Sequence, residues 1–169
     1  MRVVADTSAL VSLETVAETD SPPLDILHDQ HSVLVPRQVW NELEETASYD
    51  DTSGQAATAV LERRESFDVR SVDLDESFPL DDGENAAVAL ANDVDAVQLL
   101  CDEFNRLALI HASLTATRLV TTPILLAGFV SGGTLSADSA QELLATISEA
   151  RSWSGNNYVE RAKESMSSE

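Results

Sequence analysis

Residues 2–10 read Arg-Val-Val-Ala-Asp-Thr-Ser-Ala-Leu, a short apolar segment that ends at an acidic residue and leads into a helical pattern. The apolar run at 3–5 predicts a buried strand, and the spacing of Leu10, Leu13 and Val16 predicts a helix after it. The same order of strand, polar residue and helix returns further along the chain. This first unit therefore sets the expectation for the whole fold.

Apolar runs and helical patterns alternate along the rest of the chain. We predict further strands at 33–35, 67–72, 96–101 and 118–120. We predict further helices at 21–30, 36–49, 54–66, 85–92, 103–112, 122–132 and 136–150. Strands that alternate with helices are typical of a parallel sheet covered by helices on both faces. The predicted fold class is therefore α/β.

The length of 169 residues fits one ordinary domain, which we place at 1–150. A helical tail follows at 151–169, where Tyr158, Val159 and Ala162 recur near helical spacing, and it either covers its own domain or docks on a partner. No apolar run reaches the roughly 18 residues of a membrane span, so we expect no membrane contact and a cytoplasmic protein. The single cysteine, Cys101, excludes an internal disulfide and a multi-cysteine zinc site.

The charge is strongly acidic. Thirty acidic residues against ten basic ones give a formal net charge of −20, and all the basic residues except Lys163 are arginine. Such a chain repels itself at low salt, whereas at molar salt the Debye length falls to about 3 Å. The composition therefore suggests the cytoplasm of an extreme halophile. A disordered acidic protein is the competing interpretation, but 43% hydrophobic residues and clear periodicity argue against it.

Four acidic residues are expected at one edge of the predicted sheet. Asp6 and Asp102 each follow a strand directly, and ligands of parallel sheets bind beyond the carboxyl ends of the strands. Glu42 lies early in the helix after the second strand, and Glu84 begins an alanine-rich helix. Each acid alone has a structural explanation as a helix cap or dipole partner. Together they would repel one another without a cation, and hard oxygen ligands favour Mg²⁺ or Mn²⁺.

The acidic residues lie in motifs that resemble a known family. The motifs are Val-Val-Ala-Asp-Thr-Ser-Ala-Leu at 3–10, Val-Pro-Arg-Gln-Val-Trp-Asn-Glu-Leu at 35–43, Gly-Glu-Asn-Ala-Ala at 83–87 and Leu-Leu-Cys-Asp-Glu at 99–103. In this order they resemble the successive signatures of PIN-domain proteins, from residue 2 to about residue 135. The resemblance implies a three-layer α/β/α sandwich and Mg²⁺- or Mn²⁺-dependent cleavage of RNA. Many relatives are toxins of toxin–antitoxin pairs and form homodimers, so an antitoxin and a second copy are expected partners.

By position, the resemblance gives the metal-site roles to Asp6, Glu42, Glu84 and Asp102. Ser8 either bonds to a ligand or to metal-bound water, or caps a helix together with Thr7. The sequence departs from the family after Asp102, where relatives often have a further aspartate and this chain has Glu103. The longer Glu103 side chain either reaches a second metal ion or points to solvent.

Few groups are available for RNA binding. No basic stripe is visible, and Arg37 and Arg106 are best placed to meet a phosphate or hold a carboxylate. Aromatic residues make up only 5%, so Trp40, Phe78 and Phe104 are expected in the core or at its rim.

Two other functions fit parts of the pattern. A phosphoacceptor receiver domain also has acids at strand ends, but it needs a lysine near the last strand, and the only lysine here is Lys163 in the tail. The second alternative is a PIN-like fold that has lost catalysis and serves as a binding or regulatory module. The altered residue after Asp102 keeps this alternative open.

Overall fold

A computed structural model of the chain describes residues 1–168 and contains one five-stranded sheet in this range, in the order β3-β2-β1-β4-β5. Every neighbouring pair of strands is parallel, and Val4 on the central strand lies beside Leu34 on one side and Leu99 on the other. The strands are β1 (Arg2–Ala5), β2 (Ser32–Pro36), β3 (Asp68–Arg70), β4 (Gln98–Leu100) and β5 (Arg118–Val120). The predicted α/β class with a parallel sheet is confirmed.

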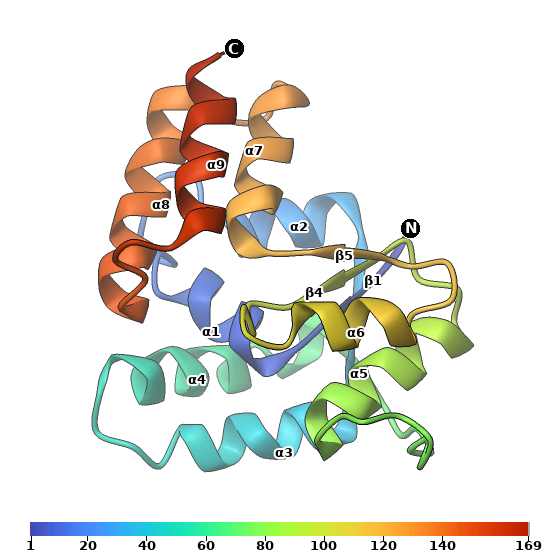
Figure 1. Cartoon of the computed structure of the whole chain (residues 1–169). Coiled ribbons are helices and arrows are strands. Elements are labelled where there is room, and N and C mark those ends of the chain that lie inside the picture. Colours follow the sequence, from blue (N-terminus) through green and yellow to red (C-terminus); the bar gives the residue numbers. More distant parts are fainter. Residues whose placement is uncertain (169) are drawn as a thin grey trace.

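Helices cover both faces of this sheet (Figure 1). Those before β4 are α1 (Thr7–Glu14), α2 (Pro23–Gln30), α3 (Arg37–Thr46), α4 (Thr52–Glu62) and α5 (Asp82–Asp93), with a single 3₁₀ turn at Arg64–Ser66. Those after β4 are α6 (Leu107–Ser113), α7 (Thr122–Ser131), α8 (Ala137–Arg151) and α9 (Asn157–Ser167).

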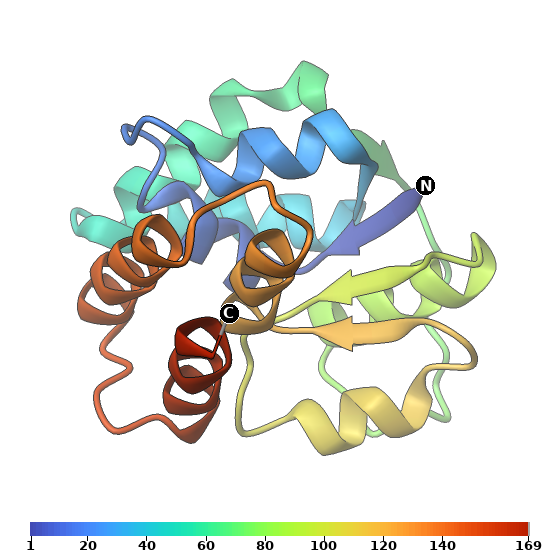
Figure 2. The ribbon, with the colours of Figure 1, turned by 90° about the horizontal axis from the view of Figure 1, so that it is seen from above.

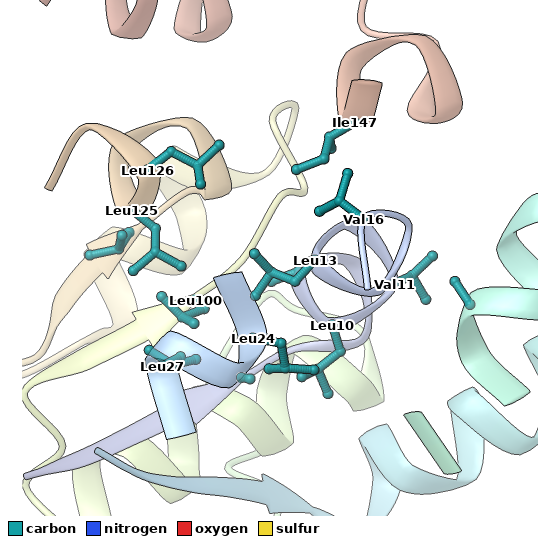
Figure 3. Packing of buried hydrophobic residues seen from close by; sticks show 14 of the residues in the cluster. Leu10, Val11, Leu13, Val16, Leu24, Leu27, Leu100, Leu125, Leu126 and Ile147 are labelled. Atoms are coloured by element: carbon teal, nitrogen blue, oxygen red, sulfur yellow. The ribbon is translucent and has the colours of Figure 1, made fainter. Parts of the chain in front are cut away.

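Alternate strand residues supply the two halves of the core. Val4 and Leu99 face a cluster formed with α5 and α6, whereas Val3 and Leu100 belong to the larger cluster on the opposite face. Figure 3 shows part of this larger cluster, in which Leu100 lies near Leu27 of α2 and Leu125 of α7, and Ile147 of α8 lies near Val16. This arrangement is the expected three-layer α/β/α sandwich.

Several predicted boundaries differ from the structure, for example the strand expected at 67–72, which spans Asp68–Arg70. The helix expected from residue 103 begins at Leu107, because the intervening segment forms tight turns with a hydrogen bond of 2.8 Å from Arg106 N to Glu103 O. The helix expected to end at residue 66 ends at Glu62 and continues as the 3₁₀ turn. Pro36, expected as a first helical residue, ends β2 in an extended conformation and precedes α3.

The C-terminal helices pack on the domain itself. Val159, Ala162 and Met166 of α9 are buried in the larger cluster, and α9 lies against α7 and α8 (Figure 1). Figure 2 shows that the arrowheads of β4 and β5 point toward the side of the molecule where α8 and α9 lie. The carboxyl edge of the sheet is therefore bordered by C-terminal segments. None of the helices among residues 1–168 is long and apolar enough to cross a membrane.

Candidate metal centre

A cavity of about 350 Å³ contains four of the predicted acids. Asp6 follows β1, Glu42 lies on α3, Glu84 lies on α5 and Glu103 follows β4 by two residues, and all four line this cavity. Four separate elements therefore bring carboxylates to one place, as the sheet topology predicts. Asp81, which the sequence analysis did not single out, lines the same cavity.

Asp6 is held by its neighbours in a buried position. Its side chain is only 5% exposed, and its Oδ2 accepts hydrogen bonds from Ser8 Oγ at 2.9 Å and from Cys101 Sγ at 3.4 Å. Although Asp6 stands at the N-cap position of α1, its side chain makes no capping bond. Burial raises the pKa of Asp6, and the Ser8 hydrogen bond opposes this shift. The helix-cap explanation therefore does not account for this carboxylate.

Glu42 has a pKa well above the ordinary value of a glutamate. Burial, followed by repulsion from Asp6 and Asp81, raises its pKa to about 7. Thr7 Oγ1 donates a long 3.4 Å hydrogen bond to Glu42 Oε1. Gly83 leaves room for the carboxylate, because a Cβ at this position would lie 1.9 Å from Glu42 Oε1.

Glu84 has a structural role as well as a place in the cavity. Glu84 and Asp81 form a capping box at the start of α5, with Glu84 N donating to Asp81 Oδ1 at 2.9 Å and Asp81 N donating to Glu84 Oε2 at 3.3 Å. Arg106 Nη2 also donates to Glu84 Oε2 at 3.1 Å. Arg106 thus fixes a carboxylate, which is one of the two roles proposed for it from the sequence. Arg37 is exposed and is not among the described residues that line the cavity.

Asp102 lies close by but directs its carboxylate elsewhere. Its Oδ1 accepts a hydrogen bond from Thr122 N at 2.7 Å, and its Oδ2 accepts one from Thr122 Oγ1 at 2.6 Å. Asp102 N donates to Ser8 Oγ at 2.9 Å, so Ser8 connects Asp102 to Asp6. Asp102 is not among the described residues that line the cavity. The carboxylate therefore ties the end of β4 to the start of α7.

Comparison with known proteins decides the family. A family model described as a PIN domain matches residues 2–168. The chain belongs to the PIN domain family. Its fold is also similar to a chain in the crystal structure of VapBC2 from Rickettsia felis bound to a DNA fragment from their promoter. That match has 12% identity and a TM-score of 0.52, and it covers 72% of this chain and 98% of the other. No curated protein matches.

Glu103 follows Asp102, where the family resemblance led us to expect an aspartate. Its side chain is exposed at the rim of the cavity. Partial desolvation, followed by repulsion from Asp6 and Glu84, raises the pKa of Glu103. The cavity-facing position is compatible with an ion ligand, since glutamate is one methylene longer than aspartate.

The donor set of this PIN domain fits a hard divalent cation in its chemistry. Carboxylate oxygens dominate the cavity, and burial followed by their mutual repulsion raises the pKa values of Glu42 and Glu103. Among residues 1–168, however, no group of three or more His, Cys, Asp or Glu side chains is arranged so that it could hold a metal ion. The carboxylates share a cavity, but some are engaged by protein partners, as the contacts of Asp6 with Ser8 and of Glu84 with Arg106 illustrate.

Sequence reasoning missed three charged residues of the cavity, namely Asp51, Asp81 and Arg151. Asp51 is the N-cap of α4, whose side chain accepts from Gly54 N. Asp81 could have been found, because Asp81-Asp82-Gly83-Glu84 has the acid-x-x-Glu spacing of a capping box. Arg151 lines the cavity from the last position of α8 and donates from Nη1 to Ser53 Oγ at 3.2 Å. No local motif marks Arg151, since only the docking of α8 brings it to the acids of the PIN domain.

Proposed function

We propose that this PIN domain is a metal-dependent endoribonuclease that hydrolyses phosphodiester bonds of RNA. One observation carries the proposal: Asp6, Glu42, Glu84 and Glu103, from four separate elements, line one cavity at the carboxyl edge of a parallel sheet. PIN domains are generally nucleases. The acidic cavity supports the same activity here, with Mg²⁺ or Mn²⁺ as the cation.

Each acid has a distinct task in this proposal. Asp6, Glu42 and Glu103 would hold the ion, because their carboxylates share the cavity with the fewest competing partners. Glu84, oriented by Arg106, is a further ligand, and Asp102 contributes if its carboxylate leaves Thr122. Divalent ions bound to such a site supply an activated water and stabilise the leaving oxygen. Ser8 orients Asp6 through its hydrogen bond.

The biological role we propose is that of a toxin in a toxin–antitoxin pair. The family resemblance supports this role, and so does the fold likeness to a chain of VapBC2. An antitoxin protein and a second copy of the chain are then the expected partners. The net charge of −20 supports a cytoplasm rich in salt as the working environment.

Cleavage of a mixed RNA pool in Mg²⁺ or Mn²⁺ tests the activity directly. We expect wild type to produce metal-dependent fragments, and both Asp6→Asn and Glu42→Gln to lose them by about a hundredfold or more. Glu44→Gln is a matched control, since Glu44 lies on the same helix, is exposed and does not line the cavity. Fragments that are equally abundant in wild type and both cavity variants would come from a contaminant and would contradict the proposal.

A catalytically impaired binding or regulatory module is the second candidate. It is favoured by the engagement of Asp102 by Thr122 and by the lack of a ready three-ligand group among residues 1–168. A Mn²⁺ titration followed by thermal unfolding separates the two, because an ion bound to the native state raises the unfolding midpoint. Stabilisation of wild type but not of Asp6→Asn supports the nuclease. Absence of both stabilisation and cleavage favours the module.

A further inference from the structure

The cavity has a second group of lining residues besides its acids. Tyr49 lies in the connection between α3 and α4, Ser53 lies in the first turn of α4, and Arg151 ends α8. We call these three residues the Tyr49–Arg151 wall. None of them has an evident part in holding a cation, so their presence in the cavity calls for a different explanation.

Arg151 is the one basic residue among the described residues that line the cavity. Its Nη1 donates to Ser53 Oγ at 3.2 Å, whereas its Nε is buried and has no hydrogen-bond partner among residues 1–168. A buried donor without a partner is costly, and a guanidinium offers a fork of N–H groups that matches phosphate oxygens. Arg151 is therefore suited to bind an anion that enters the cavity.

Tyr49 presents an aromatic ring at the same cavity. Its side chain is 62% exposed, in contrast to Trp40, which is 5% exposed and packs near Phe67. Phe104 is also engaged, since its ring stacks on Tyr158 with centroids 5.2 Å apart. Tyr49 thus differs from these aromatic residues in offering a ring to solvent beside the acids.

The backbone that carries Tyr49 is well defined by its contacts. Tyr49 N donates to Thr46 O at 3.1 Å, and Asp51 caps α4 by accepting from Gly54 N at 2.7 Å. Gly54 allows close packing here, because a Cβ at this position would lie 1.9 Å from Tyr49 O. The backbone at Tyr49 is therefore fixed beside the cavity before any ligand binds, which lowers the entropic cost of using this residue.

We infer that the Tyr49–Arg151 wall binds one nucleotide of a single-stranded nucleic acid, with a base stacked on Tyr49 and a backbone phosphate on Arg151 and Ser53. An unpaired base has a free face for stacking, whereas a base inside a duplex has both faces covered. A cavity of about 350 Å³ lies at the small end of ligand pockets and suits a single nucleotide rather than a helix. The inference rests on the proposed nuclease function and names the form of its substrate.

Binding of a fluorescent single-stranded RNA of mixed sequence, measured by anisotropy in Mg²⁺ on the Asp6→Asn background, tests the inference without cleavage. We expect Tyr49→Ala to weaken binding about tenfold and Tyr49→Phe to retain it, because stacking needs the ring and not the hydroxyl. Arg151→Gln should weaken binding and also lower the slope of log affinity against log salt by about 0.7, the value for one phosphate contact on a single strand. Tyr49→Ala should leave this slope unchanged.

Three comparisons complete the experiment. Arg118→Gln removes an exposed arginine at the start of β5, outside the cavity, and should keep both the affinity and the salt slope. A duplex of the same sequence should fail to displace the single strand. Arg151→Lys should keep the salt slope, because the positive charge remains. Its affinity should still be lower than that of the parent, because lysine lacks the forked N–H groups of the guanidinium.

Several outcomes would overturn the inference. The first is that the Asp6→Asn parent does not bind the single strand. The second is that the parent and its Tyr49→Ala and Arg151→Gln variants bind with equal affinity. The third is that duplex and single strand bind equally well. The proposed nuclease function is judged separately by cleavage. If wild type cleaves RNA but the wall variants bind normally, only the inference fails. If the wall variants lose binding but wild type does not cleave, only the nuclease function fails.

Discussion

Gly83 determines where the carboxylate of Glu42 can lie. The glycine is in the first turn of α5, and a Cβ there would meet Glu42 Oε1 at 1.9 Å and Oε2 at 3.0 Å. The obstacle is the end of a flexible side chain, so a larger residue would displace Glu42 rather than unfold the helix. Gly83 on α5 thus determines the position of a carboxylate that belongs to α3.

Gly83→Ala should therefore lower the RNA cleavage rate without lowering the stability of the fold. Alanine favours helix over glycine by about 1 kcal/mol, so we expect a thermal midpoint that is equal or slightly higher. The displaced Glu42 carboxylate should lower the RNA cleavage rate by up to about a hundredfold. Gly128→Ala on α7 is the matched control, since a Cβ there meets nothing within 4 Å. Loss of activity in both variants would argue against a specific effect at Glu42.

Glu42 should also leave a signature in the pH dependence of stability. Its folded pKa of about 7 lies above the ordinary value of 4.5, so the folded state holds this proton more tightly than the unfolded state. The stabilisation is complete below pH 4.5 and is lost as pH rises to about 7. With a metal chelator present, the wild-type protein should lose roughly 1–2 kcal/mol of unfolding free energy over this pH range because of Glu42, a figure that allows for solvent screening at a half-buried side chain. The Glu42→Gln protein should not show this loss.

The measurement is urea unfolding of both proteins at several pH values across this window, with Glu44→Gln as the control. Added Mn²⁺ should reverse the trend in wild type, because metal binding favours the ionised carboxylate. If the wild-type stability in chelator rises steadily with pH and Glu42→Gln behaves in the same way, the raised pKa of Glu42 is contradicted.

At the level of elements, the contact between Asp102 and Thr122 joins β4 to α7. The Asp102 carboxylate is 6% exposed, and its Oδ2 depends on Thr122 Oγ1 at 2.6 Å. Thr122→Val leaves this oxygen without its partner and should cost about 1–3 kcal/mol in urea unfolding. Thr117→Val is a milder comparison, because the Thr117 hydroxyl donates only a long 3.5 Å bond to Ala91 O. Equal costs in the two variants would mean that the Asp102 bond contributes little.

Element types were predictable from the sequence, whereas contacts between elements were not. The apolar runs at 3–5 and 33–35 gave unambiguous strands, because hydrophobic periodicity is a local property. The start of α6 at Leu107 depends on the turn from Glu103 to Arg106, which periodicity does not encode. The engagement of Asp102 by Thr122 depends on the pairing of β4 with β5 and could not be read from either motif alone.

The same distinction applies to the cavity. Asp6, Glu42 and Glu84 were predicted to meet from the order of the family motifs and because acids at the ends of parallel strands share one edge of the sheet. Asp102 was expected with them but is engaged by Thr122, whereas Glu103, for which the sequence left both a metal ligand and a solvent position open, lines the cavity. Arg151 escaped prediction because it comes from a helix that borders the sheet without belonging to a strand–helix unit. The boundary predicted at residue 150 lies one residue before it.

For the whole molecule, the net charge of −20 predicts a strong dependence on salt. Screening of carboxylate repulsion should stabilise the native state, and a gain of about 2 kcal/mol would raise the thermal midpoint by roughly 4–8 °C. A series of thermal melts from low salt to molar KCl measures this rise. Near pH 4 many carboxylates are protonated, so the same series should give a smaller rise. A midpoint that is independent of KCl at neutral pH would contradict the proposed adaptation to salt.

The position of Arg151 at the end of α8 also has a consequence for the order in which the site is made. Chains are synthesised from the N-terminus, at about 5–20 residues per second. A ribosome that has completed Asp6, Glu42, Glu84 and Glu103 still has 47 residues to add before it reaches Arg151. The nascent protein therefore contains the acidic residues of the cavity well before Arg151, which we propose binds a substrate phosphate. If phosphate binding by Arg151 is required for cleavage, a translation product that terminates before α8 does not cleave RNA.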